Sequence, residues 1–91
     1  MPRRLILSGD VQGVNCRYLC SRYAKHFGLK GSASNLRDGT VEVLLASEDD
    51  ALVERYSKAL RENPLDVHFY GHISGIRVHE FNGPLSGDYN F

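Results

Sequence analysis

The period of the apolar residues changes along this chain in a definite order, and that order limits the fold more than any other feature. Strand-like and helix-like segments follow one another as β-α-β-β-α-β. This order predicts an α+β, ferredoxin-like two-layer sandwich with two helices on one face of an antiparallel sheet. We allow a short fifth edge strand over residues 88–91. The expected strands cover residues 4–8, 30–36, 40–45 and 67–80, and the helices run from Arg17 to Phe27 and along the apolar stripe from Leu52 to Leu60.

Local signals between these segments support the assignment. Asp38-Gly39 stands between two strand-like runs, which is a strong indication of a hairpin. Ser47 and Asp50, three residues apart ahead of the second apolar stripe, resemble a capping box that would open the second helix. Gly71 and Gly75, within the last expected strand, favour a bulge or bend. Each signal falls at a boundary or irregularity that the predicted fold requires.

The size and charge of the chain limit its functions. Its 91 residues predict one domain spanning residues 1–91, with a monomer as the expected state. The 11 basic and 11 acidic side chains balance, so nothing favours non-specific binding to nucleic acid or a membrane surface. No apolar run has the length of a membrane span, no signal peptide is evident, and two cysteines are too few for a disulfide scaffold. We therefore expect a cytoplasmic location.

The segment from Gly9 to Arg17 has the residues expected of an anion-binding site. A glycine-containing loop between a strand and a helix can gather backbone N–H groups around one point, where the helix N-terminus adds positive charge. Arg17, in the first helical turn, can hold a phosphate through two parallel hydrogen bonds. On spacing alone the bland alternative stays open: Gly13 would serve a tight turn, and Arg17 would be a solvated residue at the helix start.

The run Val-Gln-Gly-Val-Asn-Cys-Arg at residues 11–17 resembles the signature of the acylphosphatase family, which has Val-Gln-Gly-Val, any residue, Phe and Arg. Residues 28–31 (Gly-Leu-Lys-Gly), Asn35 and residues 38–42 (Asp-Gly-Thr-Val-Glu) are similar to that family's second block. The resemblance is dense from residue 7 to residue 45 and looser beyond. Two linked motifs in the right order are a specific signal.

The resemblance implies hydrolysis of an acyl phosphate to a carboxylate and inorganic phosphate, without a metal or other cofactor. Arg17 would bind the phosphoryl group, and Asn35 would hold the attacking water. A side-chain amide suits that task, since it offers both a donor and an acceptor and does not titrate. Without the resemblance, Asn35 would be read as a strand-end residue that caps backbone groups. The implied backbone ligands of the phosphate are Val11, Gln12, Gly13, Val14, Asn15 and Cys16.

Two positions depart from the family's pattern. Cys16 stands where the family usually has Phe, on the apolar face of the expected helix, so we expect looser packing beneath the loop. Asn15 replaces a small or aromatic residue, and asparagine tolerates the positive φ that such a loop can need. We therefore expect the phosphate ligands to be retained while the catalytic rate is weakened.

The cysteines and histidines are weaker candidates for a metal or redox site. Cys16 and Cys20 lie four apart, as metal or redox cysteines can, but both are expected on the apolar face, where cysteine behaves as a small hydrophobe. His68 and His72 would share one face of a strand about 13 Å apart, and His79 would face the other way, so surface histidines are the better interpretation.

Two functions other than catalysis remain as alternatives. The first is a non-catalytic anion-binding or regulatory module that uses the same cradle; the presence of both Arg17 and Asn35 favours the enzyme. The second is an RNA-binding sheet, which needs exposed aromatics on its central strands, whereas residues 41–45 read Val-Glu-Val-Leu-Leu. The identity of the acyl group is not encoded in a motif that recognises phosphate.

Overall fold

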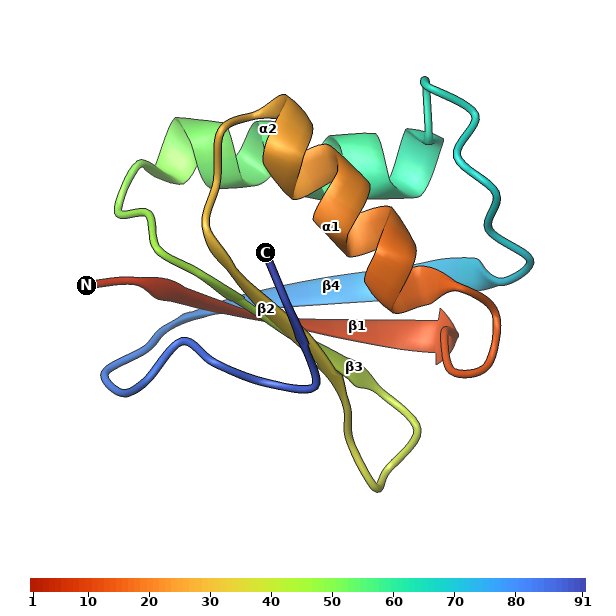
Figure 1. Cartoon of the computed structure of the whole chain (residues 1–91), viewed down its shortest axis with the longest axis horizontal. Helices are drawn as coiled ribbons and strands as arrows, with labels where there is room; N and C mark the ends of the chain where they lie inside the picture. Colours follow the sequence, from red (N-terminus) through yellow and green to blue (C-terminus); the bar gives the residue numbers. More distant parts are fainter.

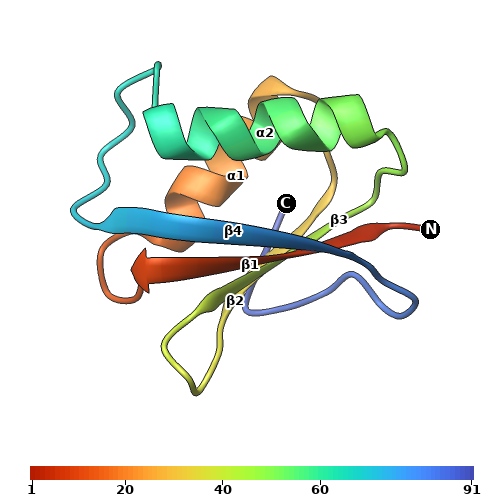
Figure 2. The ribbon, with the colours of Figure 1, turned by 180° about the vertical axis from the view of Figure 1, so that it is seen from behind.

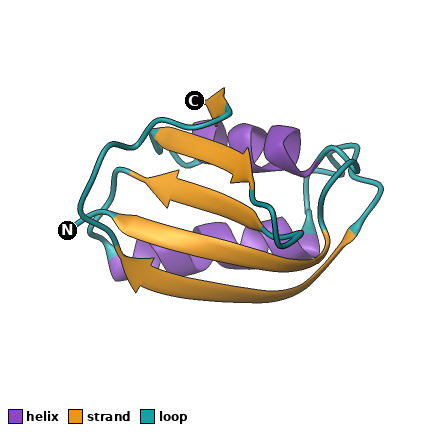
Figure 3. Ribbon diagram, turned by 90° about the horizontal axis from the view of Figure 1, so that it is seen from below, coloured by secondary structure: helices purple, strands orange, loops and turns teal.

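Two helices cover one face of a five-stranded antiparallel sheet in the computed structural model, which describes residues 1–91 (Figures 1 and 3). The predicted α+β, ferredoxin-like fold is confirmed, including the short fifth strand at the edge. Neither helix has the length and apolar character needed to cross a membrane. In chain order the elements are β1 (Arg3–Asp10), α1 (Cys16–His26), β2 (Gly31–Asn35), β3 (Val41–Leu45), α2 (Asp50–Glu62), β4 (His72–Glu80) and β5 (Tyr89–Asn90).

The order of the strands in the sheet is β4-β1-β3-β2-β5, and every neighbouring pair is antiparallel. Both β1 and β2 are therefore antiparallel to β3, so β1 and β2 run in the same direction and end at the same end of the sheet. β5 begins at that end too, because it runs against β2 with Ala33 opposite Tyr89. The loop that follows β1 thus meets the last residue of β2 and the first of β5.

The hydrophobic core lies between the sheet and the helices and contains 19 buried residues. Alternation along the two central strands directs one face into it, with Leu5 and Leu7 from β1 and Val41, Val43 and Leu45 from β3, all fully buried. This is the face that the sequence alternation predicted. Because α1 packs on this core, its first turn is held near the end of β1.

Tyr23 of α1 ties the end of α2 to the core. Its ring is fully buried, and its hydroxyl donates to Asn63 Oδ1 at 2.7 Å and accepts from the backbone N–H of Leu65 at 2.9 Å. We expect Tyr23→Phe to lower the free energy of unfolding by about 1–2 kcal/mol, because both partners lose a bond in a partly buried site. Urea unfolding measures this. Tyr70→Phe, whose ring is 74% exposed, is the matched control; equal midpoints for the two variants would contradict the role of Tyr23.

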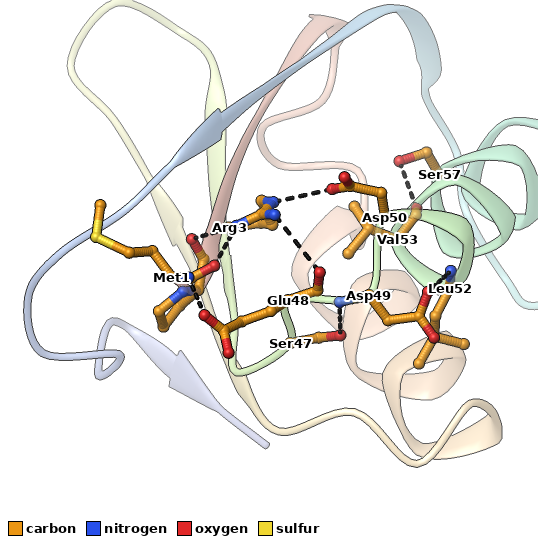
Figure 4. Close-up of polar contacts among 10 residues, drawn as sticks. Met1, Arg3, Ser47, Glu48, Asp49, Asp50, Leu52, Val53 and Ser57 are labelled. Atoms are coloured by element: carbon orange, nitrogen blue, oxygen red, sulfur yellow. Dashed lines mark hydrogen bonds and ion pairs between the residues drawn. The ribbon is translucent and has the colours of Figure 1, made fainter.

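The first residues of α2 differ from the expected capping box. Asp49 is the cap, and its carboxylate accepts from the N–H of Leu52 at 3.2 Å, while Ser47 Oγ accepts from the N–H of Asp49 at 3.2 Å (Figure 4). Asp50 instead forms an ion pair with Arg3 at 3.1 Å. The prediction of a Ser47–Asp50 box was wrong, because the ion pair with a distant strand takes the Asp50 carboxylate and Asp49 is closer to the free N–H groups.

The last long strand begins later than expected. Residues 67–71 are a connection, and β4 starts only at His72. The backbone of this connection pairs with the loop after β1 instead of the sheet, since Tyr70 N–H donates to Val14 O at 3.0 Å. Gly71 permits that approach, because a Cβ there would lie 2.0 Å from Asp10 O. The connection is thereby held against the loop that carries the predicted site.

Of the two glycines where a bulge or bend was expected in this strand, Gly75 lies beside one, whereas Gly71 lies ahead of β4. The register between β1 and β4 pairs Ser8 with Gly75 and then Gly9 with Ile73, so Ser74 has no partner. A bulge of this kind bends a strand and increases its twist. It lies near the end of β1, where the chain leaves the sheet for the loop.

Candidate active site

A pocket of about 210 Å³ lies where β1, β2 and β5 meet the start of α1. It brings together six of the eight residues predicted for the site, while Gln12 and Val14 are not among those that line it. Tyr18 and Tyr89 complete the wall, and neither was predicted. The lining residues are Val11, Gly13, Asn15, Cys16, Arg17, Tyr18, Asn35 and Tyr89.

The loop between β1 and α1 has the conformation of an anion cradle. Gly13 and Asn15 both have φ of 73°, the left-handed region, so the positive φ that we expected asparagine to tolerate at position 15 is present. Asn15 caps α1 without a side-chain hydrogen bond, and the first turn contains no acidic residue. No backbone N–H from Val11 to Tyr18 donates in the turn and loop hydrogen bonds of the main chain. These donors and the helix dipole favour an anion at this point.

Arg17 extends from the first turn of α1 toward the start of β5. Its Nη1 lies 3.7 Å from Asp88 Oδ2, and both side chains are substantially exposed. Asp88 Oδ2 also accepts from the backbone N–H of Asn35 at 3.1 Å. One carboxylate thus links the two residues that the sequence predicted as catalytic. Asp88 was missed by sequence reasoning, since an aspartate ahead of a short edge strand carries no distinguishing local signal.

Asn35 is the last residue of β2, held by its register with Val41 of β3. Its Oδ1 atom is buried and has no hydrogen-bond partner. Buried polar atoms are nearly always satisfied, so this acceptor leaves the Asn35 side chain, at the wall of the pocket, with an unused hydrogen-bonding group. The backbone of Asn35 is meanwhile fixed by Asp88. The side chain is therefore presented by a rigid strand end.

The side chain of Gln12 has a role that the sequence did not indicate. Its Nε2 donates to Leu36 O at 2.6 Å and to Thr40 O at 2.9 Å, so it joins the cradle loop to the β2–β3 hairpin. The hairpin is stiffened in turn by Asp38, whose carboxylate accepts from the hydroxyl and the N–H of Thr40. These bonds lower the pKa of Asp38. Gln12 thus fixes the distance between the loop and the strand that carries Asn35.

We expect Gln12→Glu to lower the free energy of unfolding by about 2 kcal/mol, because a carboxylate would face two carbonyl oxygens in place of a donor. Turnover is expected to fall on the order of tenfold, because the loop after β1 and Asn35 are no longer held at a fixed distance from each other. Urea unfolding and kcat measure the two effects. Gln12→Ala, which removes the bonds without adding charge, should show smaller losses. If Gln12→Glu unfolded at the wild-type urea concentration, the two hydrogen bonds of Gln12 would contribute nothing to stability.

The cysteines occupy the apolar setting that the sequence predicted. Cys16 and Cys20 are both free and buried on the inner face of α1. The hydrogen bond with Cys20 lowers the pKa of the Cys16 thiol, and the Arg17 guanidinium acts in the same direction against the effect of burial. The same bond, together with burial, raises the pKa of Cys20. Cys16 therefore lies under the cradle as a small core residue that also touches the pocket.

The histidines are surface residues. His68, His72 and His79 are all exposed, as the sequence predicted. His68 lies in the connection before β4 and not on the strand where we expected it. No group of three or more His, Cys, Asp and Glu side chains is placed to hold a metal ion.

Comparisons with known proteins agree on one family. The family model described as Acylphosphatase matches residues 3–82. An acylphosphatase of Alkalilimnicola ehrlichii is 46% identical over 76 residues, covering 84% of this chain and 80% of that protein. An acylphosphatase of Vibrio cholerae is 37% identical over 82 residues, covering 88% and 89%. Among solved structures, acylphosphatase from Bacillus subtilis superposes with a TM-score of 0.72 at 27% identity, covering 91% of this chain and 87% of that one.

Proposed function

This chain belongs to the acylphosphatase family of hydrolases, and on that premise we propose that it hydrolyses acyl phosphates to a carboxylate and inorganic phosphate in the pocket between the loop after β1 and the end of β2. One observation carries the proposal. Arg17 and Asn35, from different elements, line the same small pocket as a loop with free backbone N–H groups. A guanidinium, an amide cradle and a neutral amide are the groups that this reaction needs.

The phosphoryl group binds between the cradle and Arg17. The N–H groups of the loop and of the first turn of α1 surround its oxygens, and the helix dipole adds positive charge. Arg17 exchanges its exposed contact with Asp88 for two parallel hydrogen bonds to the phosphate. This exchange costs little, because an ion pair at 3.7 Å between exposed side chains is weak. The positive groups of the chain neutralise the phosphoryl oxygens, so the proposed reaction draws on no metal ion.

Asn35 holds the attacking water through its side-chain amide, which has no hydrogen-bond partner in the chain at Oδ1 and turns toward the pocket when the water binds. The water oxygen forms a bond to phosphorus while the bond between phosphorus and the acyl oxygen breaks. The bonding electrons leave with the carboxylate, which needs no proton, and the proton of the water passes to a phosphate oxygen. Because the leaving group is this good, positioning and charge stabilisation suffice and no strong base is required.

Hydrolysis of acetyl phosphate by the purified chain, with and without a chelator, tests the proposal. We expect phosphate release that the chelator leaves unchanged and that inorganic phosphate inhibits competitively. Activity that disappears with the chelator would contradict the metal-free mechanism. Binding of phosphate without any turnover would instead favour the alternative of a non-catalytic anion-binding module.

A further inference from the structure

The strand β4 forms a long free edge of the sheet. Over its nine residues, from His72 to Glu80, it has β1 as a neighbour on one side and no strand on the other. Figure 3 shows β4 as the outermost strand, and Figure 2 shows α2 running above it. The strand at the opposite edge, β5, has only two residues. An unpaired edge presents a row of backbone N–H and C=O groups with which a further strand can pair.

A hollow of about 620 Å³ opens between this edge and α2. Its apolar lining consists of Val53 from α2 and of Ile76 and Val78 from β4. Val78 is paired with the fully buried Leu5, so it belongs to the face of the sheet that carries the core, yet it is 47% exposed. The apolar layer between sheet and helices is therefore incomplete at this edge. Exposed apolar side chains gathered at a hollow are typical of an interaction surface.

The wall of the hollow on α2 is charged, and its charges are complementary to themselves. Glu54 and Lys58 are exposed and stand symmetrically about Tyr56, the middle residue of the helix. Neither takes part in any ion pair within the chain, and the same holds for Arg61 and Glu62 at the end of the stripe. When two copies of the helix lie side by side and antiparallel, a two-fold axis at its middle sets Glu54 of each copy against Lys58 of the other.

The free edge and the charged stripe require the same symmetry. Two β4 strands that pair antiparallel across a two-fold axis continue the sheet from one copy into the next. The same axis leaves the helices of both copies on one face of that sheet, with α2 antiparallel to its counterpart. Ile76 is the middle residue of β4, and pairing centred there sets Arg77 opposite Gly75 of the other copy, so the two arginines do not face each other. The apolar linings of the two hollows then cover one another.

We propose that this edge is the interface of a homodimer, in which β4 pairs with β4 of a second copy and α2 packs beside α2 of that copy. A second copy is the occupant that the charges favour, because the stripe on α2 complements itself. The monomer expected from the sequence followed from chain length, which carries no information about an unpaired edge. The pocket of the candidate active site draws Asn35 and Tyr89 from β2 and β5, toward the opposite edge, so the dimer leaves both pockets open. The inference does not depend on the proposed function.

Sedimentation equilibrium over a range of concentrations tests the dimer. We expect the wild type to have twice the mass of one chain. Glu54→Lys and Lys58→Glu each set like charges against each other twice across the axis, so each should raise the dissociation constant on the order of tenfold. The double variant Glu54→Lys/Lys58→Glu restores opposite charges between the copies and should recover the wild-type value. Lys25→Glu, the same change of charge at an exposed position of α1, is the matched control and should leave the value unchanged.

A second variant tests the pairing of the strands. Val78→Lys places a charge in the apolar part of the hollow and at an edge where lysine opposes pairing, so it should also weaken the dimer. Circular dichroism checks that each variant keeps the fold. A wild type that sediments as a monomer at every concentration overturns the inference. A dimer that ignores the single charge reversals, or that the double variant fails to recover, forms through another surface and overturns it as well.

Discussion

Replacing Arg17 by lysine is expected to remove nearly as much activity as replacing it by alanine, with kcat/KM lowered by on the order of a hundredfold to a thousandfold in both variants. The guanidinium presents a planar pair of donors that matches two phosphate oxygens, whereas an ammonium offers one point charge on a flexible stem. The geometry strengthens this expectation. Arg17 is positioned from the first turn of α1 with Asp88 3.7 Å away, and a lysine there could pair with that carboxylate without reaching two phosphate oxygens.

Steady-state kinetics with acetyl phosphate and the inhibition constant of inorganic phosphate measure this effect. Both Arg17 variants should bind phosphate much more weakly, because the same guanidinium holds substrate and product. Arg61→Lys, an exposed arginine on α2, is the matched control and should retain wild-type kinetics. If Arg17→Lys retained most of the wild-type kcat/KM, a positive charge alone would suffice, and bidentate hydrogen bonding to the phosphate would not be used.

The second large effect is expected from Asn35→Ala, which should lower kcat by on the order of a hundredfold or more and leave phosphate inhibition largely intact. The amide carries no charge, and its buried Oδ1 is free of any partner in the chain, so its loss removes the site for the water and little else. The backbone N–H of Asn35, which holds Asp88, is retained in the alanine variant. The edge strand and the position of Arg17 should therefore be preserved.

Asn82→Ala, which removes an amide in an exposed turn, is the control for this substitution. Thermal unfolding of both variants checks that the fold is intact. If Asn35→Ala weakened phosphate inhibition and spared turnover, Asn35 would be a phosphate ligand and the proposed division of labour with Arg17 would be wrong. The two substitutions together thus separate binding of the phosphoryl group from positioning of the water.

The parts of the site that could be predicted depend on local pattern. The glycine-containing loop ahead of an amphipathic helix indicated an anion cradle, and asparagine at position 15 was expected to accept the positive φ that it adopts. Asp38-Gly39 predicted the hairpin that carries Asn35 on one of its strands. Linking Arg17 with Asn35 required the resemblance to a known family, because nothing in the spacing of two residues 18 positions apart states that they meet.

The parts that could not be predicted depend on partners distant in the chain. Asp88 approaches Arg17 across 71 residues, and its role follows only from the pairing of β5 with β2. Gln12 was assigned to the cradle through its backbone, yet its side chain clamps a hairpin more than 20 residues away. The cap of α2 was misplaced because Arg3, in the first strand, takes the carboxylate of Asp50.

The sequence by itself determined the order of strands and helices and the glycine-containing loop ahead of α1, since both depend on the period of apolar residues and on backbone preferences within a few positions. Only the tertiary structure decided which side chains approach the loop after β1 from across the sheet, as Asp88 and Asn35 do. The strand order places β2 and β5 on one side of the loop and the connection to β4 on the other. That arrangement is the result of packing the whole core, so no short segment encodes it.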